Sequence, residues 1–239
     1  MCFSMTLTNF IDYAEKHYNQ INLISEALLK PHYYINAFTN PLHPVVIRQE
    51  NEEILTLLQW GLIPAWTPNK TKAEELKLMT LNARAETLLE KPSFKESFKK
   101  RRCLIPADGF FEWREYNGKK YPYYITLKSK RTFSFAGIWD LWTDPETGEE
   151  IKTFSLITTE ANKIMEQIHN TKKRMPVILN CENEKEWMLL GNKELLRPYD
   201  ENDMTAYTIS KDITKKGIDL DSPEIIRQFD YEELPEFNP

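Results

Sequence analysis

Cysteine is scarce in this chain of 239 residues, which contains three: Cys2, Cys103 and Cys181. An odd, widely spaced set is not a disulfide framework, and no Cys-x-x-Cys pair or Cys/His cluster has the spacing of a zinc site. The sequence therefore predicts no disulfide, no bound metal and no cofactor, as expected for a protein of the reducing cytoplasm.

Long apolar runs are also missing. No segment approaches the ~20 apolar residues that a membrane-spanning helix needs. The N-terminal segment carries Asp12 and Glu15 and has no long apolar core, so it does not resemble a signal peptide. We therefore expect a cytoplasmic protein that does not interact with membranes.

A surplus of positive charge is absent as well. There are 31 Lys and Arg against 36 Asp and Glu, which gives a net charge of −5. This balance provides no overall attraction to nucleic acid, so any DNA binding needs a local basic patch. The runs at 99–102 and 172–174 could form one, although most charge runs are simply solvated faces.

Linkers rich in glycine and serine are missing too, and no internal repeat divides the chain. Hydrophobic residues make up 41% and aromatic residues 12%, which indicates a folded protein with a substantial core. We expect one α+β domain over residues 1–239, with a curved, mostly antiparallel β-sheet or barrel and peripheral helices. The polar segment 210–239 is expected to pack on this domain, and the protein is expected to be a monomer.

Local patterns predict the individual elements. The strongest is Asn117-Gly118 between two strand-like runs in 109–129, which is typical of a hairpin turn. The runs 131–142 and 152–159, on either side of a turn at 144–148, would continue it as an antiparallel meander. Further strands are expected at 41–49, 52–64 and 174–179. Helices are expected at 9–30, 81–91, 93–103, 159–169 (capped by Thr159) and 182–191 (closed by Gly191), and a helix or a solvated loop at 71–79.

Cys2 follows the initiator methionine, and loss of Met1 would leave a thiol and a free α-amine on adjacent carbons. Such a 1,2-aminothiol condenses with an aldehyde to an imine, and the thiolate then closes on the imine carbon to give a thiazolidine. The α-amine has a reference pKa of about 7.7–8.0, so part of it is neutral and nucleophilic near pH 7. Position alone favours the ordinary interpretation, in which Cys2 is simply an early residue of the fold.

Two polar stretches contain partners for this chemistry. In LNARAET (81–87), Asn82 offers an amide that donates and accepts, and Arg84 offers a planar fork suited to phosphate. In IHNTKKRMPVIL (168–179), His169 could move protons or bond a sugar hydroxyl. Each has an ordinary alternative: a capped helix start with an exposed Arg84, and a helix-terminal His169 that interacts with the helix dipole.

A third stretch, GFFEWRE (109–115), contains a carboxyl group among aromatic residues. On a strand, Glu112 shares its face with Phe110 and Arg114. Aromatic neighbours desolvate a carboxyl group, which raises its pKa and suits it to general acid–base catalysis near neutrality. The alternative is an edge-strand glutamate that faces water and pairs with Arg114.

In this order the stretches resemble the SRAP (SOS response-associated peptidase) family, whose members crosslink to abasic sites in DNA. The resemblance spans nearly the whole chain. It rests on the N-terminal Met-Cys, WGLIPAW (60–66), LNARAET (81–87), RRCLIPADGFFEW (101–113), YPYYITL (121–127), FAGIWD (135–140), FSLITTEAN (154–162) and the block from His169 through RMPVIL (174–179). This combination is far more specific than any one motif.

The resemblance implies a DNA-damage response protein that acts on abasic sites in single-stranded DNA and is nucleoid-associated when bound to them. Cys2, exposed by autocatalytic loss of Met1, would attack the ring-opened aldehyde and leave a stable thiazolidine crosslink. The chain would thus be a self-processing cysteine-type peptidase, a hydrolase, with an additional lyase-like activity.

The resemblance also implies a role for each site residue. Asn82 would orient the Cys2 amine or the deoxyribose. Glu112 would move protons in both reactions, and His169 would assist ring opening and steady the sugar oxygens. The DNA-binding residues would be Arg84 and Arg174 for the flanking phosphates and Trp66 for stacking on a base.

The chain departs from the family pattern at four places. Phe3-Ser4 stands where Gly-Arg is common, YYINAF (33–38) replaces a Tyr-Asn-Val-Ala-Pro tract, and Thr67 replaces a second tryptophan. Two extra residues separate His169 from Arg174. These departures leave the chemistry in place and bear on DNA binding.

Two other functions stay open. A cysteine-type peptidase or amidase acting in trans would use Cys2 or Cys103 as the nucleophile and His169 as the base. Cys103 lies in the apolar run RCLIPA (102–107), where a core position is expected. A non-covalent single-stranded DNA-binding module would keep the groove without the covalent step, and salt would weaken its binding.

Overall fold

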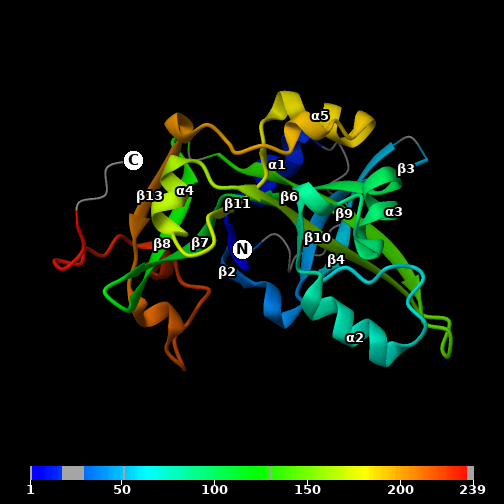
Figure 1. Ribbon diagram of the computed structural model, residues 1–239, viewed down its shortest axis with the longest axis horizontal. Helices are drawn as coiled ribbons and strands as arrows, with labels where there is room; N and C mark the ends of the chain where they lie inside the picture. The colour runs from blue at the N-terminus through cyan, green and yellow to red at the C-terminus, as the bar shows by residue number, and fades with distance from the viewer. Residues whose placement is uncertain (1, 18–29, 51, 130, 236–239) are drawn as a thin grey trace.

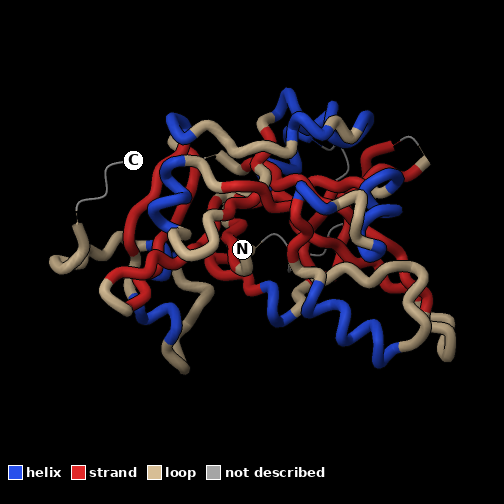
Figure 2. Tube along the Cα trace, viewed as in Figure 1, coloured by secondary structure: helices blue, strands red, loops and turns tan. Residues whose placement is uncertain are grey.

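The computed structural model describes residues 2–17, 30–50, 52–129 and 131–235. Two sheets lie side by side, with helices around them (Figures 1 and 2). The helices are α1 (Phe10–His17), α2 (Lys70–Met79), α3 (Pro92–Lys100), α4 (Lys163–Ile168) and α5 (Cys181–Leu190). Among these described residues, no helix is long and apolar enough to cross a membrane.

The larger sheet closes on itself as a barrel. Its ring runs β10-β4-β3-β6-β9 and returns to β10 through the long β9–β10 pairing. All pairings in the ring are antiparallel except β4 with β10. The strands are β3 (Leu42–Gln49), β4 (Glu52–Trp60), β6 (Arg102–Ala107), β9 (Phe133–Thr143) and β10 (Glu150–Glu160). The expected barrel and the antiparallel pairing of 131–142 with 152–159 around the turn at 144–148 are confirmed. The expected continuation of the 109–129 hairpin into this pair is wrong, because β8 (Lys119–Leu127) pairs with β7 (Gly109–Tyr116) and β13 (Met204–Thr208) in the other sheet.

The second sheet is antiparallel throughout, in the order β13-β8-β7-β1-β2. Its strands are β1 (Ser4–Leu7), β2 (His32–Asn36), β7 (Gly109–Tyr116), β8 (Lys119–Leu127) and β13 (Met204–Thr208). The β7–β8 turn has positive φ at Asn117 (49°) and Gly118 (71°). Two consecutive left-handed residues are what a tight type I′ hairpin turn requires, so the predicted hairpin is confirmed.

One hydrophobic core joins the two sheets. Met5 and Phe110 from the antiparallel sheet pack in the same buried cluster as Trp60, Phe135 and Phe154 from the barrel. A shared core of this kind makes the two sheets one α+β domain. The helices lie at the periphery, as expected (Figure 2).

Two predicted helical features are wrong. Residues 81–91 form no α-helix: Asn82–Arg84 is the short strand β5, which pairs in parallel with β10. Helix α4 is capped by Asn162, whose side chain accepts from Met165 N, because the backbone of Thr159 is used in the pairing of β10 with β11 (Arg174–Pro176). The other helices are confirmed at 70–79, 92–100 and 181–190, and Gly191 (φ 61°) ends α5 as predicted. The predicted helix 9–30 is present as α1 to His17, and its remainder lies outside the described residues.

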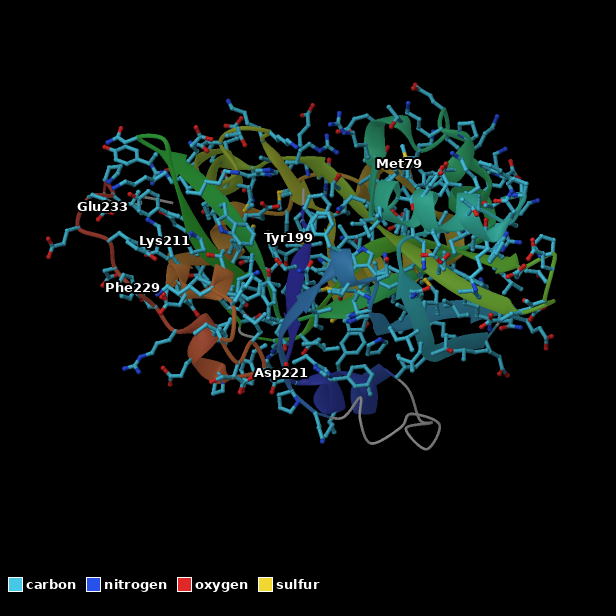
Figure 3. All side chains as sticks on the ribbon, turned by 90° about the horizontal axis from the view of Figure 1, so that it is seen from below. Met79, Tyr199, Lys211, Asp221, Phe229 and Glu233 are labelled. Carbon is cyan, nitrogen blue, oxygen red and sulfur yellow. The ribbon has the colours of Figure 1, made fainter. Side chains whose placement is uncertain are left out.

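The C-terminal segment packs along the antiparallel sheet. Tyr231 and Leu234 contact the main core. The ammonium of Lys211 lies 3.6 Å from the centre of the Tyr121 ring, and Tyr121 donates a hydrogen bond to Glu233. Lys211 and Glu233 lie at the same end of the molecule, away from α2 (Figure 3).

Candidate functional site

Cys2 lies just before β1 and its side chain is fully buried in the core that joins the sheets. Its Sγ lies 3.6 Å from the carbonyl oxygen of Ser4, to which the thiol donates. Burial raises the pKa of this thiol, and the nearby negative charge of Glu112 raises it further. The thiol is therefore protonated near neutral pH and needs a local change in charge before it can react.

Glu112 is presented by β7, the strand that pairs with β1. Alternation along β7 places it on the face of Phe110, as predicted, and its side chain is buried. Burial raises the pKa of Glu112 to about 7. Near neutrality the carboxyl group is therefore populated both as an acid and as a base, which is the condition for moving protons in either direction.

His169 ends helix α4 and faces Glu112. Its Nδ1 donates to the backbone carbonyl of Arg174 at 2.9 Å, which leaves Nε2 as the basic nitrogen of the neutral ring. Burial lowers the pKa of His169 to about 4. Its Nδ1 lies 3.8 Å from Oε1 of Glu112. Because the ring is neutral near pH 7, this approach is a contact between a polar ring and a carboxyl group and not an ion pair.

Asn82 is held in β5, opposite Leu156 of β10. Only 9% of its surface is exposed, and neither its amide nitrogen nor its amide oxygen has a hydrogen-bond partner among the described residues. An unpaired buried polar group costs about 1–3 kcal/mol, so it is retained only where something compensates. The structure thus brings Glu112 and His169 together, and the charge of Glu112 acts on the buried Cys2 thiol. Asn82 keeps a donor and an acceptor that no described residue uses.

The two arginines expected to hold phosphates differ in their surroundings. Arg84 is exposed at the end of β5. Arg174 is buried, and its guanidinium donates to both carboxylate oxygens of Glu86, at 2.6 and 3.0 Å, and to the carbonyl of Thr158 at 2.6 Å. Contact between Arg174 and a phosphate would have to displace Glu86, and this role stays a prediction.

Trp66 lies on the loop between β4 and α2, and 55% of its surface is exposed. The loop is anchored beside it, since Ala65 N donates to the buried carboxylate of Asp140 at 3.1 Å. Thr67 is buried and donates to the carbonyl of Pro64, so Trp66 is the one aromatic side chain at this tip of the described loop. Stacking of Trp66 on a base stays a prediction.

Other candidates from the sequence lie in the core. Cys103 is fully buried in β6, as expected, and burial raises the pKa of its thiol well above the usual value. Ser4 is buried in β1 and supplies no positive charge. Within the described ranges, no group of His, Cys, Asp and Glu side chains has the arrangement of a metal site.

Comparison with known proteins shows the family to which the chain belongs. The family model "SOS response associated peptidase (SRAP)" matches residues 1–216. The chain belongs to the SRAP family. It is 40% identical over 233 residues to "Abasic site processing protein YoqW" of Bacillus subtilis, covering 95% of this chain and 99% of that protein. "Abasic site processing protein HMCES" of Xenopus tropicalis is 34% identical over 160 residues, 59% of this SRAP chain and 47% of the relative.

Solved structures extend the comparison to the fold. A crystal structure of a protein from Bacteroides thetaiotaomicron matches this SRAP chain with a TM-score of 0.88 and 40% identity, over 95% of this chain and all of that one. A second, from Bordetella bronchiseptica, has a TM-score of 0.73 at 23% identity, over 87% of this chain and 100% of the other. The SRAP fold is thus shared even where the sequences have diverged.

The sequence did not reveal one polar contact beside the site. Asn170, directly after His169, bonds through its side-chain amide to both the backbone N–H (3.1 Å) and the carbonyl (2.8 Å) of Glu115. Both partners are backbone groups, so no pairing of residue types could have indicated the contact. It attaches the loop with the extra residues to the edge of β7.

Proposed function

We propose that the protein senses abasic sites in single-stranded DNA and forms a thiazolidine crosslink to them through Cys2, after autocatalytic removal of Met1. The observation that carries this proposal is a carboxyl group of pKa about 7, Glu112, whose charge acts on the buried Cys2 thiol and whose Oε1 lies 3.8 Å from the neutral imidazole of His169. Membership of the SRAP family and the names of the relatives, which are abasic site processing proteins, support it.

The first reaction is hydrolysis of the Met1–Cys2 peptide bond. Water adds to the carbonyl carbon of Met1, the C–N bond breaks, and the nitrogen of Cys2 takes up a proton as methionine leaves. Glu112 in its ionised form accepts the proton from the attacking water and, once protonated, delivers it to the leaving nitrogen. While Met1 is attached, the nitrogen of Cys2 is an amide and cannot form an imine.

The second reaction joins the processed protein to DNA. The Cys2 amine adds to the C1′ aldehyde of the ring-opened sugar, and the resulting carbinolamine loses water to give an iminium ion. The Cys2 sulfur, having lost its proton, then bonds to the same carbon, and the nitrogen becomes a neutral secondary amine. Glu112 protonates the departing hydroxyl group and can take the proton from the thiol, so no oxidant or reductant is needed.

His169 and Asn82 have supporting roles in the proposal. The Nε2 of the neutral His169 ring can accept a proton or a hydrogen bond from a sugar hydroxyl, which assists ring opening. The unpaired amide of Asn82 can donate to a sugar oxygen and accept from the Cys2 amine. Binding of the damaged nucleotide would then satisfy both buried atoms, which compensates for their cost in the free protein.

The remaining contacts are with the DNA strand. Exposed Arg84 is suited to a flanking phosphate, and exposed Trp66 to stacking on a base. The trans-acting hydrolase with Cys103 as nucleophile has less support, because Cys103 is enclosed in the barrel.

A crosslinking experiment tests the proposal. The wild type and Cys2→Ala are incubated with a single-stranded oligonucleotide that contains an abasic site, then analysed by denaturing electrophoresis and intact mass. We expect loss of methionine and gain of the DNA mass with the wild type, and no crosslink with Cys2→Ala. Equal behaviour of the two proteins would refute the proposal. A band that disappears on denaturation would favour the non-covalent binding module.

A further inference from the structure

The loop between α4 and β11 carries a lysine, Lys172, that has no acidic partner among the described residues. Its backbone is fixed at several points: Lys173 N donates to the carbonyl of His169 at 2.8 Å, and Ala161 N donates to the carbonyl of Lys173 at 3.1 Å. Lys173 itself adopts a left-handed conformation, with φ of 48°. A loop held in this way presents its side chains in fixed directions.

The Asn170 contact places this loop against β7. Strand β1 pairs with β7 at Gly109 and Phe110, so the edge of β7 beyond these residues is not covered by β1. There the amide of Asn170 donates to and accepts from the backbone of Glu115, as a neighbouring strand would. The residues that follow Asn170 are thereby held near the edge of β7, the strand that carries Glu112.

The cations of the loop have different partners. Lys173 lies 3.7 Å from a carboxylate oxygen of Glu166, and Arg174 is paired with Glu86. Lys172 is exposed and forms no ion pair with any residue that the structure describes. Lys172 lies three residues after His169, and its backbone N–H donates to the carbonyl of His169 at 3.3 Å.

A second cation without an acidic partner lies on β7 itself. Arg114 is two residues from Glu112 on the same face of the strand. Within the described part of the chain, its guanidinium makes one hydrogen bond, a long one of 3.4 Å to the hydroxyl of Tyr123. Its Nε is buried and has no hydrogen-bond partner among the residues that the structure describes. A planar fork of donors with one weak partner is suited to a phosphate oxygen.

We propose that Lys172 and Arg114 bind phosphates of the damaged strand, and that the two hydrogen bonds from the Asn170 side chain to the backbone of Glu115 position the loop that carries Lys172. The ligand class is the phosphodiester backbone of single-stranded DNA beside the abasic nucleotide. This inference rests on the proposed function and adds two binding residues to it. It also offers a source of local positive charge in a protein of net charge −5, since Arg114 shares a strand face with Glu112 and Lys172 lies on the loop that follows His169.

Salt dependence of DNA binding tests this role. The probe is a labelled single-stranded oligonucleotide with a tetrahydrofuran abasic-site analogue, which has no aldehyde and measures non-covalent binding only. Each phosphate contact contributes about 0.7 to the slope of log K against log salt for single strands. We therefore expect Lys172→Gln and Arg114→Gln each to make the slope shallower by about 0.7. Between 50 and 200 mM salt, each variant should lose about 2.6-fold less affinity than the wild type does.

Matched controls separate a contact from a change in total charge. Lys173→Gln and Arg227→Gln remove the same charge from side chains already paired with Glu166 and Glu224, and should leave the slope unchanged. Arg114→Lys retains a cation and should keep most of the slope. An unchanged slope in Lys172→Gln and Arg114→Gln, or an equal change in the controls, would overturn the inference. Failure of the wild type to crosslink a true abasic site would instead refute the proposed function, which the analogue does not test.

Discussion

Replacement of Glu112 by glutamine is expected to change how the stability of the protein depends on pH. Burial raises the pKa of Glu112 from 4.5 to about 7, so between these values the folded protein keeps a proton that the unfolded chain releases. The contribution of this group to the free energy of unfolding is therefore full below pH 4.5 and is lost as the pH rises to 7. The shift corresponds to about 3 kcal/mol, at about 1.4 kcal/mol per pKa unit.

His169 has the opposite effect in an overlapping range. Burial lowers its pKa from 6.5 to about 4, so between these values the unfolded chain binds a proton that the folded protein does not. The free energy of unfolding therefore rises with pH over this range, while the contribution of Glu112 falls. The two effects oppose each other in the wild type. Each single substitution should therefore leave the pH dependence of the free energy of unfolding that the other group causes.

Urea unfolding between pH 4 and 8, followed by tryptophan fluorescence, measures both effects. The free energy of unfolding of the wild type minus that of Glu112→Gln should fall by about 3 kcal/mol from pH 4.5 to 7. The same difference for His169→Gln should rise from pH 4 to 6.5. Glu90→Gln, at an exposed carboxylate, is the control. A wild-type minus Glu112→Gln difference that is flat or rising would show that the carboxyl group is not desolvated as described.

Two further substitutions test the binding side of the site. Asn82→Ala removes an amide that has no hydrogen bond to any described residue, so the free energy of unfolding should stay within about 1 kcal/mol of the wild type while crosslinking slows. The control Asn162→Ala removes the cap of α4 and should destabilise the protein by about 1 kcal/mol. Trp66→Ala should weaken binding of the abasic-analogue oligonucleotide by about 1–3 kcal/mol with no loss of stability, whereas Met79→Ala, another exposed apolar side chain, should bind as the wild type does. Normal crosslinking by Asn82→Ala, or equal binding by the Trp66 and Met79 variants, would contradict these roles.

The elements that the sequence predicted well are those specified by neighbouring residues. Asn117 and Gly118 adopt the positive φ values that make a hairpin, and Gly191 ends α5 in the left-handed region. The face and the burial of Glu112 followed from strand alternation and aromatic neighbours. In each case, the residues that determine the local structure lie within a few positions of it in the sequence.

The errors involve partners that are distant in the sequence. Residues 81–91 have helical propensity, yet Asn82–Arg84 pairs with β10, more than 70 residues later, and tertiary pairing overrides local preference. The sequence shows a cluster of positive charge at 172–174. It could not predict that Arg174 pairs with Glu86, which lies 88 residues earlier. The distinction between a paired and an unpaired cation in that cluster depends on the fold, so the sequence alone could not predict it.

The raised pKa of the Cys2 thiol also sets the order of steps in the proposed reaction. Burial and the charge of Glu112 keep the Cys2 thiol protonated, so sulfur is a poor nucleophile at the start. The amine exposed by loss of Met1 is partly neutral near pH 7 and reacts first. The iminium ion that it forms places a positive charge two carbon atoms from the sulfur, which favours the thiolate and lowers the pKa of the thiol. In this order, the thiol becomes reactive only after the amine has captured the aldehyde. The thiol is therefore unreactive in the resting protein, and its sulfur attacks only the carbon atom of the iminium ion.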